Sequence, residues 1–89
     1  MAGSVVVKDV AALEQFAGRL SRTSQQLEQS ARELTSALNA VGQSWQDPQK
    51  EKCAKEIEGI AKAMRGFVQA ANEQVTYCRR LAAKVRELP

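Results

Sequence analysis

The sequence Gly42-Gln43-Ser44-Trp45-Gln46-Asp47-Pro48 separates two long segments that are rich in strong helix formers. Gly42 is typical of the residue that ends a helix. Asp47 is a good N-cap, because its carboxylate accepts hydrogen bonds from the free N–H groups of a first turn, and Pro48 suits the first helical position. The pattern predicts one helix over about residues 9–42, a bend over residues 43–47 and a second helix over about residues 48–88.

The first segment carries apolar residues at heptad spacing. Asp9 is a suitable N-cap for it, and Val10 is its first apolar residue. Two columns recur every seven residues: Leu13, Leu20, Leu27, Leu34 and Val41, and, three positions ahead of each, Val10, Ala17, Ser24, Ala31 and Leu38. A heptad sustained over a whole segment predicts a long helix that packs against another helix, as in a coiled coil.

The second segment carries three apolar columns. They are Cys53, Ile60, Phe67, Gln74, Leu81 and Leu88; Ile57, Met64, Ala71, Cys78 and Val85; and Ala54, Ala61, Val68, Val75 and Ala82. We assign the first two columns to the seam between the helices and expect residues whose numbers sum to 91 to face each other. The predicted hairpin seam contains Leu13, Leu20, Leu27, Leu34, Ile57, Ile60, Met64 and Phe67.

The fold class is therefore an all-α antiparallel two-helix hairpin that forms one domain over residues 1–89. Residues 1–8 are expected to be an extended segment, with Val5-Val6-Val7 lying along the end of the second helix. One hairpin has a single internal seam, so the further apolar columns need another surface to cover them, and small scaffolds often solve this by association. We expect a four-helix bundle of two hairpins. The predicted assembly interface is the column Phe16, Thr23, Ser30 and Ala37.

The composition argues against an enzyme, a metal site or a bound cofactor. The chain has no histidine, which removes the commonest general base and metal ligand, and it has no glycine-rich phosphate loop. Cys53 and Cys78 lie on one predicted helix about 40 Å apart, too far for an intrachain disulfide. No apolar run is long enough to span a membrane, and residues 1–9 do not resemble a signal peptide.

Basic residues gather near the end of the second helix. They are Arg79, Arg80, Lys84 and Arg86. Such a basic tail can attract nucleic acid, anionic lipid or an acidic partner. Cations at a helix C-terminus also complement the helix dipole and solvate its outer surface, and we favour this interpretation because the net charge is only +3.

Two helices joined by a bend that carries a central tryptophan resemble the WXG family of small proteins associated with type VII secretion, the early-secretory-antigen-like proteins. The resemblance covers nearly the whole chain. Here the motif is Trp45-Gln46-Asp47, with aspartate in place of the family's glycine. The family's export signal has an acidic residue four positions after a tyrosine, whereas Tyr77 is followed at that spacing by Leu81.

The resemblance implies a hairpin that dimerises and that is exported without a signal peptide, or helps a partner to be exported, by a membrane ATPase machine. We therefore expect a non-enzymatic protein-interaction module that is a homo-oligomer or pairs with a related hairpin, located in the bacterial cytoplasm or secreted. The alternatives are an intracellular structural or adaptor subunit and a weakly basic hairpin associated with nucleic acid. Trp45 and Asp47 form the candidate partner-binding bend, where Trp45 serves either as an exposed anchor or as a plug against Val41 and Cys53.

Overall fold

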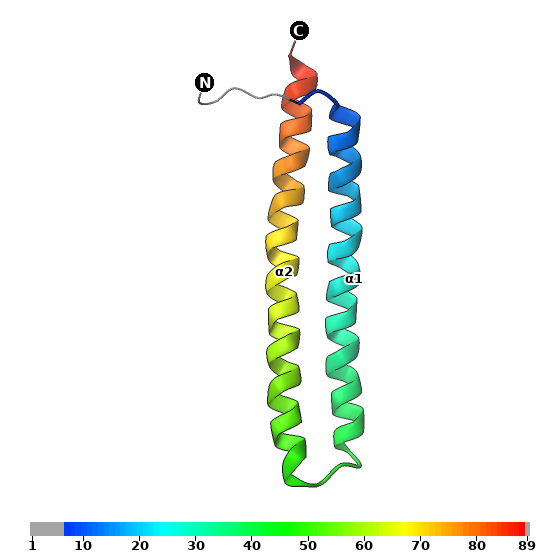
Figure 1. The fold of residues 1–89 in the computed structure, drawn as a ribbon. Coiled ribbons are helices and arrows are strands. Elements are labelled where there is room, and N and C mark those ends of the chain that lie inside the picture. The colour runs from blue at the N-terminus through cyan, green and yellow to red at the C-terminus, as the bar shows by residue number, and fades with distance from the viewer. Residues whose placement is uncertain (1–6, 89) are drawn as a thin grey trace.

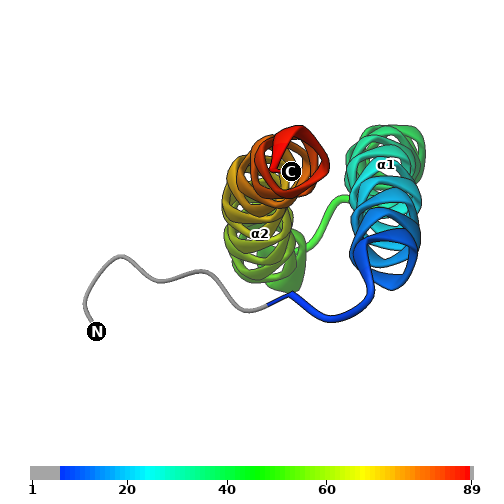
Figure 2. The ribbon, with the colours of Figure 1, turned by 90° about the horizontal axis from the view of Figure 1, so that it is seen from above.

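The computed structural model describes residues 7–88, which form two long antiparallel helices (Figure 1). Helix α1 covers Val10–Gly42 and helix α2 covers Pro48–Glu87. Seen along their axes, the helices lie side by side in a single layer (Figure 2). The predicted all-α hairpin is confirmed. Of the N-terminal segment, Val7 is half-buried, and Val5 and Val6 lie outside the described residues.

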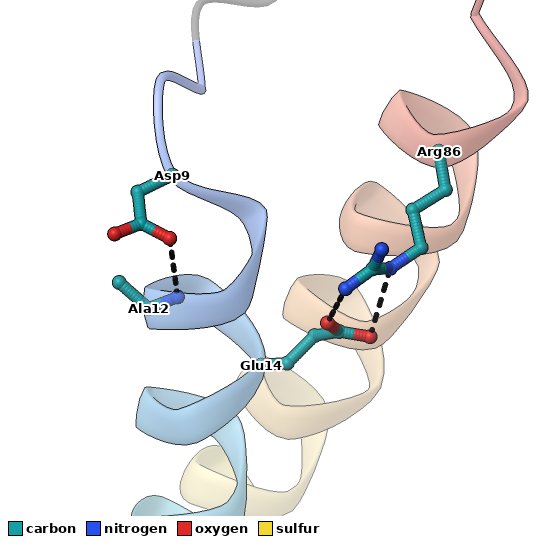
Figure 3. Close-up of polar contacts among 4 residues, drawn as sticks. All are labelled: Asp9, Ala12, Glu14 and Arg86. Carbon is teal, nitrogen blue, oxygen red and sulfur yellow. Dashed lines mark hydrogen bonds and ion pairs between the residues drawn. The ribbon is translucent and has the colours of Figure 1, made fainter.

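The helix boundaries follow the capping signals in the sequence. Asp9 accepts a hydrogen bond of 2.9 Å from the backbone N–H of Ala12 (Figure 3), and Asp47 accepts one of 2.8 Å from the N–H of Gln49. Gly42 is the last residue of α1, and its carbonyl oxygen accepts a hydrogen bond of 3.1 Å from Lys50 Nζ. The lysine ammonium also complements the negative end of the α1 dipole.

Small residues form the centre of the seam. The residues exposed by at most 2% come from α1 and α2 alike and are Ala17, Ser24, Ala31, Ala61 and Ala82. Val68, Val75 and Cys78 are buried beside them. The leucines Leu13, Leu20, Leu27 and Leu34 are half-buried, as are Ile57 and Met64, so the large side chains flank this centre. Small residues allow the two backbones to approach closely along the whole hairpin.

Ile60 and Phe67 do not belong to the seam, and that part of the prediction is wrong. Ile60 is 50% exposed and Phe67 is 69% exposed. The reason is that α2 turns its alanine and valine column, which includes Ala61 and Val68, toward the small residues of α1. Turning this column inward moves the column of Ile60 and Phe67, one residue earlier, to the outside of the hairpin.

A buried hydrogen bond marks the register of the two helices. Ser24 is 2% exposed, and its hydroxyl donates to Asn72 Oδ1 at 2.8 Å, with the carbonyl oxygen of Val68 as a second acceptor at 3.4 Å. The numbers of Ser24 and Val68 sum to 92, so the observed register is one residue from the predicted sum of 91. A buried hydroxyl needs such acceptors, and a slipped register would remove them.

An ion pair joins the open ends of the helices (Figure 3). Arg86 Nε donates to Glu14 Oε2 at 3.3 Å, and Arg86 Nη2 donates to Glu14 Oε1. The hydrogen bond from Arg86 is the main reason that the pKa of Glu14 is lowered. Arg86, which belongs to the predicted basic tail, therefore joins the two helices by pairing with Glu14.

The Glu14–Arg86 pair makes hairpin stability depend on pH. Because the pKa of Glu14 is lowered in the folded state, the pair stabilises the fold above the ordinary carboxyl pKa, and this contribution is lost as the pH falls through the folded-state pKa. We expect Glu14→Gln to lower the melting temperature at pH 7 and to lower it much less at about pH 2, which is below the ordinary carboxyl pKa of about 4.3. Circular dichroism melting curves at both pH values measure the difference.

The matched control for Glu14→Gln removes the other partner. Arg86→Gln should lower the melting temperature at pH 7 by a similar amount, and the double variant should be no less stable than either single variant. Equal effects of Glu14→Gln at the two pH values would show that the ion pair is not their cause.

Candidate partner-binding face

Two columns of residues lie together on one face of the hairpin. Each member directly precedes a seam position, and in an antiparallel pair of helices such positions share one side. The column on α1 is Phe16, Thr23, Ser30 and Ala37, and the column on α2 is Cys53, Ile60, Phe67 and Gln74. We call these eight residues the apolar face. Near the bend, Ala37 and Cys53 line one groove together, as expected for two helices that present the same face.

The apolar face exposes large hydrophobic side chains to solvent. Phe16 is 55% exposed, and Phe67, at 69%, is more exposed than any other large hydrophobic residue of the described chain. The half-buried leucines of α1 and the side chains of Ile57 and Met64 lie between this face and the seam. Large hydrophobic side chains that gather on one exposed face are typical of a surface that binds another protein.

The predicted assembly interface covers one of the two columns of this face. The sequence predicts that the α1 column forms an assembly interface, and the structure leaves Phe16, Thr23, Ser30 and Ala37 exposed. The α2 column is absent from that prediction because Ile60 and Phe67 are predicted to lie in the seam, whereas the structure exposes both. The signal that could have found it is the presence of three apolar columns on α2, which is one more than a two-stranded seam can bury.

A groove of about 300 Å³ lies at the bend end of this face. Its lining is almost wholly apolar and consists of Leu34, Ala37, Leu38, Val41, Trp45, Cys53 and Ile57. Trp45 is half-buried, so its ring lies in the same groove as Val41 and Cys53 while part of its surface stays exposed. Asp47 is exposed and caps α2. The bend therefore presents an aromatic side chain beside an open apolar groove.

The remaining reactive and charged groups do not gather into one site. Cys53 is half-buried and Cys78 is buried, and both are free thiols. Arg79, Arg80 and Lys84 are exposed on α2. Within residues 7–88, no three cysteine, aspartate or glutamate side chains come together as a metal site.

The same described part of the chain has no helix with the length and apolar character needed to cross a bilayer.

The family model named WXG100, described as proteins of 100 residues with WXG, matches residues 8–88. This match covers both helices and the bend, and thus all of the apolar face and the groove beside Trp45. Comparison with curated proteins and with solved structures gives no match.

Proposed function

Because this chain belongs to the WXG100 family of small proteins associated with type VII secretion, we propose that it pairs through its apolar face with a second helical hairpin and is exported with that partner. It works by recognition and not by catalysis. The two hairpins form a four-helix bundle whose core contains Phe16, Ile60 and Phe67.

The exposure of Phe67 is the observation that carries this proposal. A two-helix layer buries only one side of each helix, and the side chains left outside include two phenylalanines and an isoleucine on the same face. Burial of apolar surface contributes about 25 cal/mol per Å², so covering this strip is a strong driving force for association. A second hairpin has the length and the shape to cover the strip from end to end.

Trp45 in the bend and Tyr77 on α2 are the two residues that bear on how the paired hairpins are exported. Trp45 is half-buried beside the bend groove, where its exposed part is available to a component of the secretion machinery. Tyr77 is 60% exposed, and the residue one helical turn later is Leu81 instead of an acidic residue. We therefore expect the export signal to be completed by other features of the assembled pair and not by Tyr77 alone.

Export by a type VII system tests this function. The tagged chain is produced in a bacterium that carries such a system, with and without its ATPase, and its amount is measured in cells and in culture medium. We expect the chain in the medium only when the ATPase is present, and we expect Phe67→Asp to keep it inside the cells. The matched variant Gln69→Asp, which adds the same charge on another side of α2, should be exported like the unmodified chain.

A cytosolic marker protein controls for lysis in this experiment. Retention of the chain in the cells whether or not the ATPase is present would contradict export and would favour the intracellular adaptor.

A further inference from the structure

We propose that residues 1–6, which we call the N-terminal strap, pack into a groove on the outer surface of α2 and are anchored there by Val5. We call it the tail groove. It has a volume of about 540 Å³ and is lined by Tyr77, Arg80, Leu81, Ala83, Lys84 and Glu87. The contact lies within one chain, so it does not depend on which second hairpin covers the apolar face.

The chemistry of the tail groove suits an uncharged apolar occupant. Its surface is mainly apolar, and the ring of Tyr77 is 60% exposed. The charged side chains at its rim include both Lys84 and Glu87, so the rim does not select a partner of one charge. The strap, Met-Ala-Gly-Ser-Val-Val, contains no charged side chain and ends in two apolar residues. Burial of such residues against an apolar surface is favourable.

The tail groove lies where α2 extends past the start of α1. Since Ser24 lies beside Val68, residues of the two helices are level when their numbers sum to 92, and Val10 at the start of α1 is level with Ala82. Helix α2 continues from there to Glu87. Only the chain that precedes α1 is placed to cover this end of α2 from within the same molecule.

The chain leaves α1 on the side that leads to the groove. Asp9 is one heptad ahead of Phe16, so it lies on the side of the apolar face. Leu81 is one heptad after Gln74, so this edge of the tail groove continues the same face. Figure 2 shows the dark blue segment ahead of α1 running from α1 toward α2.

The strap is long enough to make this contact. Packed helices have axes about 8–10 Å apart. The four extended residues that lead from Asp9 back to Val5 span about 13–14 Å. Val5 therefore reaches the edge of the groove beside Leu81. A tether this short holds the strap near the groove at a millimolar effective concentration, which favours it over a separate partner.

Val5 is the anchor because side chains alternate along an extended segment. Val7 is half-buried, so its side chain faces the hairpin. The side chain two residues earlier faces the same way, whereas that of Val6 faces solvent. Val5 and Val6 thus form a matched pair with the same side chain and opposite orientations. In the tail groove, Val5 covers part of the exposed ring of Tyr77.

Intrachain disulfide trapping tests the contact. In the full chain with Cys53→Ser and Cys78→Ala, one variant carries Val5→Cys with Lys84→Cys, and the matched control carries Val5→Cys with Arg79→Cys. Residues 79 and 84 are both exposed on α2, but residue 79 lies outside the tail groove. A disulfide needs Cα atoms within about 7 Å, so we expect the bond to residue 84 to form roughly tenfold faster.

Nitration of Tyr77 by tetranitromethane gives a second readout. Tyr77 is the only tyrosine of the chain, so the rate reports on the cover of its ring. In the same cysteine-free background, Val5→Asp should raise the rate severalfold, because a charge is unfavourable in the apolar groove and displaces the strap. Val6→Asp should leave the rate unchanged. Circular dichroism confirms that each variant keeps its helices.

Faster bonding to residue 84, with a rise in nitration specific to Val5→Asp, supports the strap. Equal bonding rates at residues 79 and 84 would overturn it, and so would equal nitration of Val5→Asp and Val6→Asp. Either of these results would leave the tail groove open to a separate partner. Neither readout requires export or a second hairpin, so failure here leaves the function proposed above standing.

Discussion

Phe67→Asp should convert the assembled protein into single hairpins. In the proposed four-helix bundle, Phe67 leaves water and packs against the second hairpin, so aspartate would bring a charge into an apolar contact. Loss of a central aromatic contact costs about 2–4 kcal/mol in protein interfaces, which corresponds to roughly a 30- to 1000-fold weaker affinity. Sedimentation equilibrium of the variant and the unmodified chain measures this change in the dissociation constant.

The fold of a single chain should survive Phe67→Asp, because Phe67 is 69% exposed and contributes little to the seam. Gln69→Asp serves as the matched control, since it adds the same charge two residues away on a surface that the bundle leaves in water. An unchanged dissociation constant for Phe67→Asp, with helicity retained, would show that the apolar face does not hold the assembly together.

Ala61→Phe should strongly destabilise the hairpin. Ala61 is 1% exposed at the point where the helices approach each other, so the larger ring would force the backbones apart. Overpacking of this kind costs about 1–3 kcal/mol. A small single-core scaffold has only about 3–5 kcal/mol of stability to lose. Thermal unfolding followed by circular dichroism should show a melting temperature lowered by 10 °C or more, since about 1 kcal/mol shifts a domain of this size by roughly 4–8 °C.

Ala83→Phe is the matched control for the seam. Ala83 also lies on α2, but it is exposed, so the same substitution there meets open solvent and should change the melting temperature little. If Ala61→Phe were as stable as Ala83→Phe, the close packing of small residues would not be what holds the two helices together.

The helices and the bend could be predicted because their signals are local. Asp9, Gly42, Asp47 and Pro48 each act on the turn of helix in which they lie, and the structure uses each of them at the predicted position. The heptad likewise requires only that apolar residues share one side of a helix. These features depend on neighbours within about one turn, so the sequence alone is enough to identify them.

The orientation of α2 could not be predicted in the same way. Its three columns are all apolar, and hydrophobicity favours burial of Ile60 and Phe67 over Ala61 and Val68. The decision depends on the facing helix, where Ala17, Ser24 and Ala31 leave room for a close approach. Burial of the small residues is favoured because it brings the two long backbones close together along many layers of the seam. Asn72, the partner of Ser24, lies outside every apolar column and gave no signal in the sequence.

The candidate site was predicted in part for the same reason. The α1 column is predicted as an interface because it lies outside the best heptad, while the α2 column is absent from that prediction because Ile60 and Phe67 are assigned to the seam. Trp45 was identified by its place in the bend, and the structure adds the groove beside it, which is built by residues from both helices. A groove of that kind depends on tertiary packing and has no local sequence signal.

The solution mass of the unmodified chain tests the central claim most directly. Size-exclusion chromatography with light scattering, at low and high salt and over a range of concentrations, gives this mass without a label. We predict a particle of at least twice the 9.7 kDa chain mass in both salts, because salt screening has little effect on a mainly apolar interface. A mass of 9.7 kDa at every concentration would contradict assembly of the unmodified chain through its apolar face.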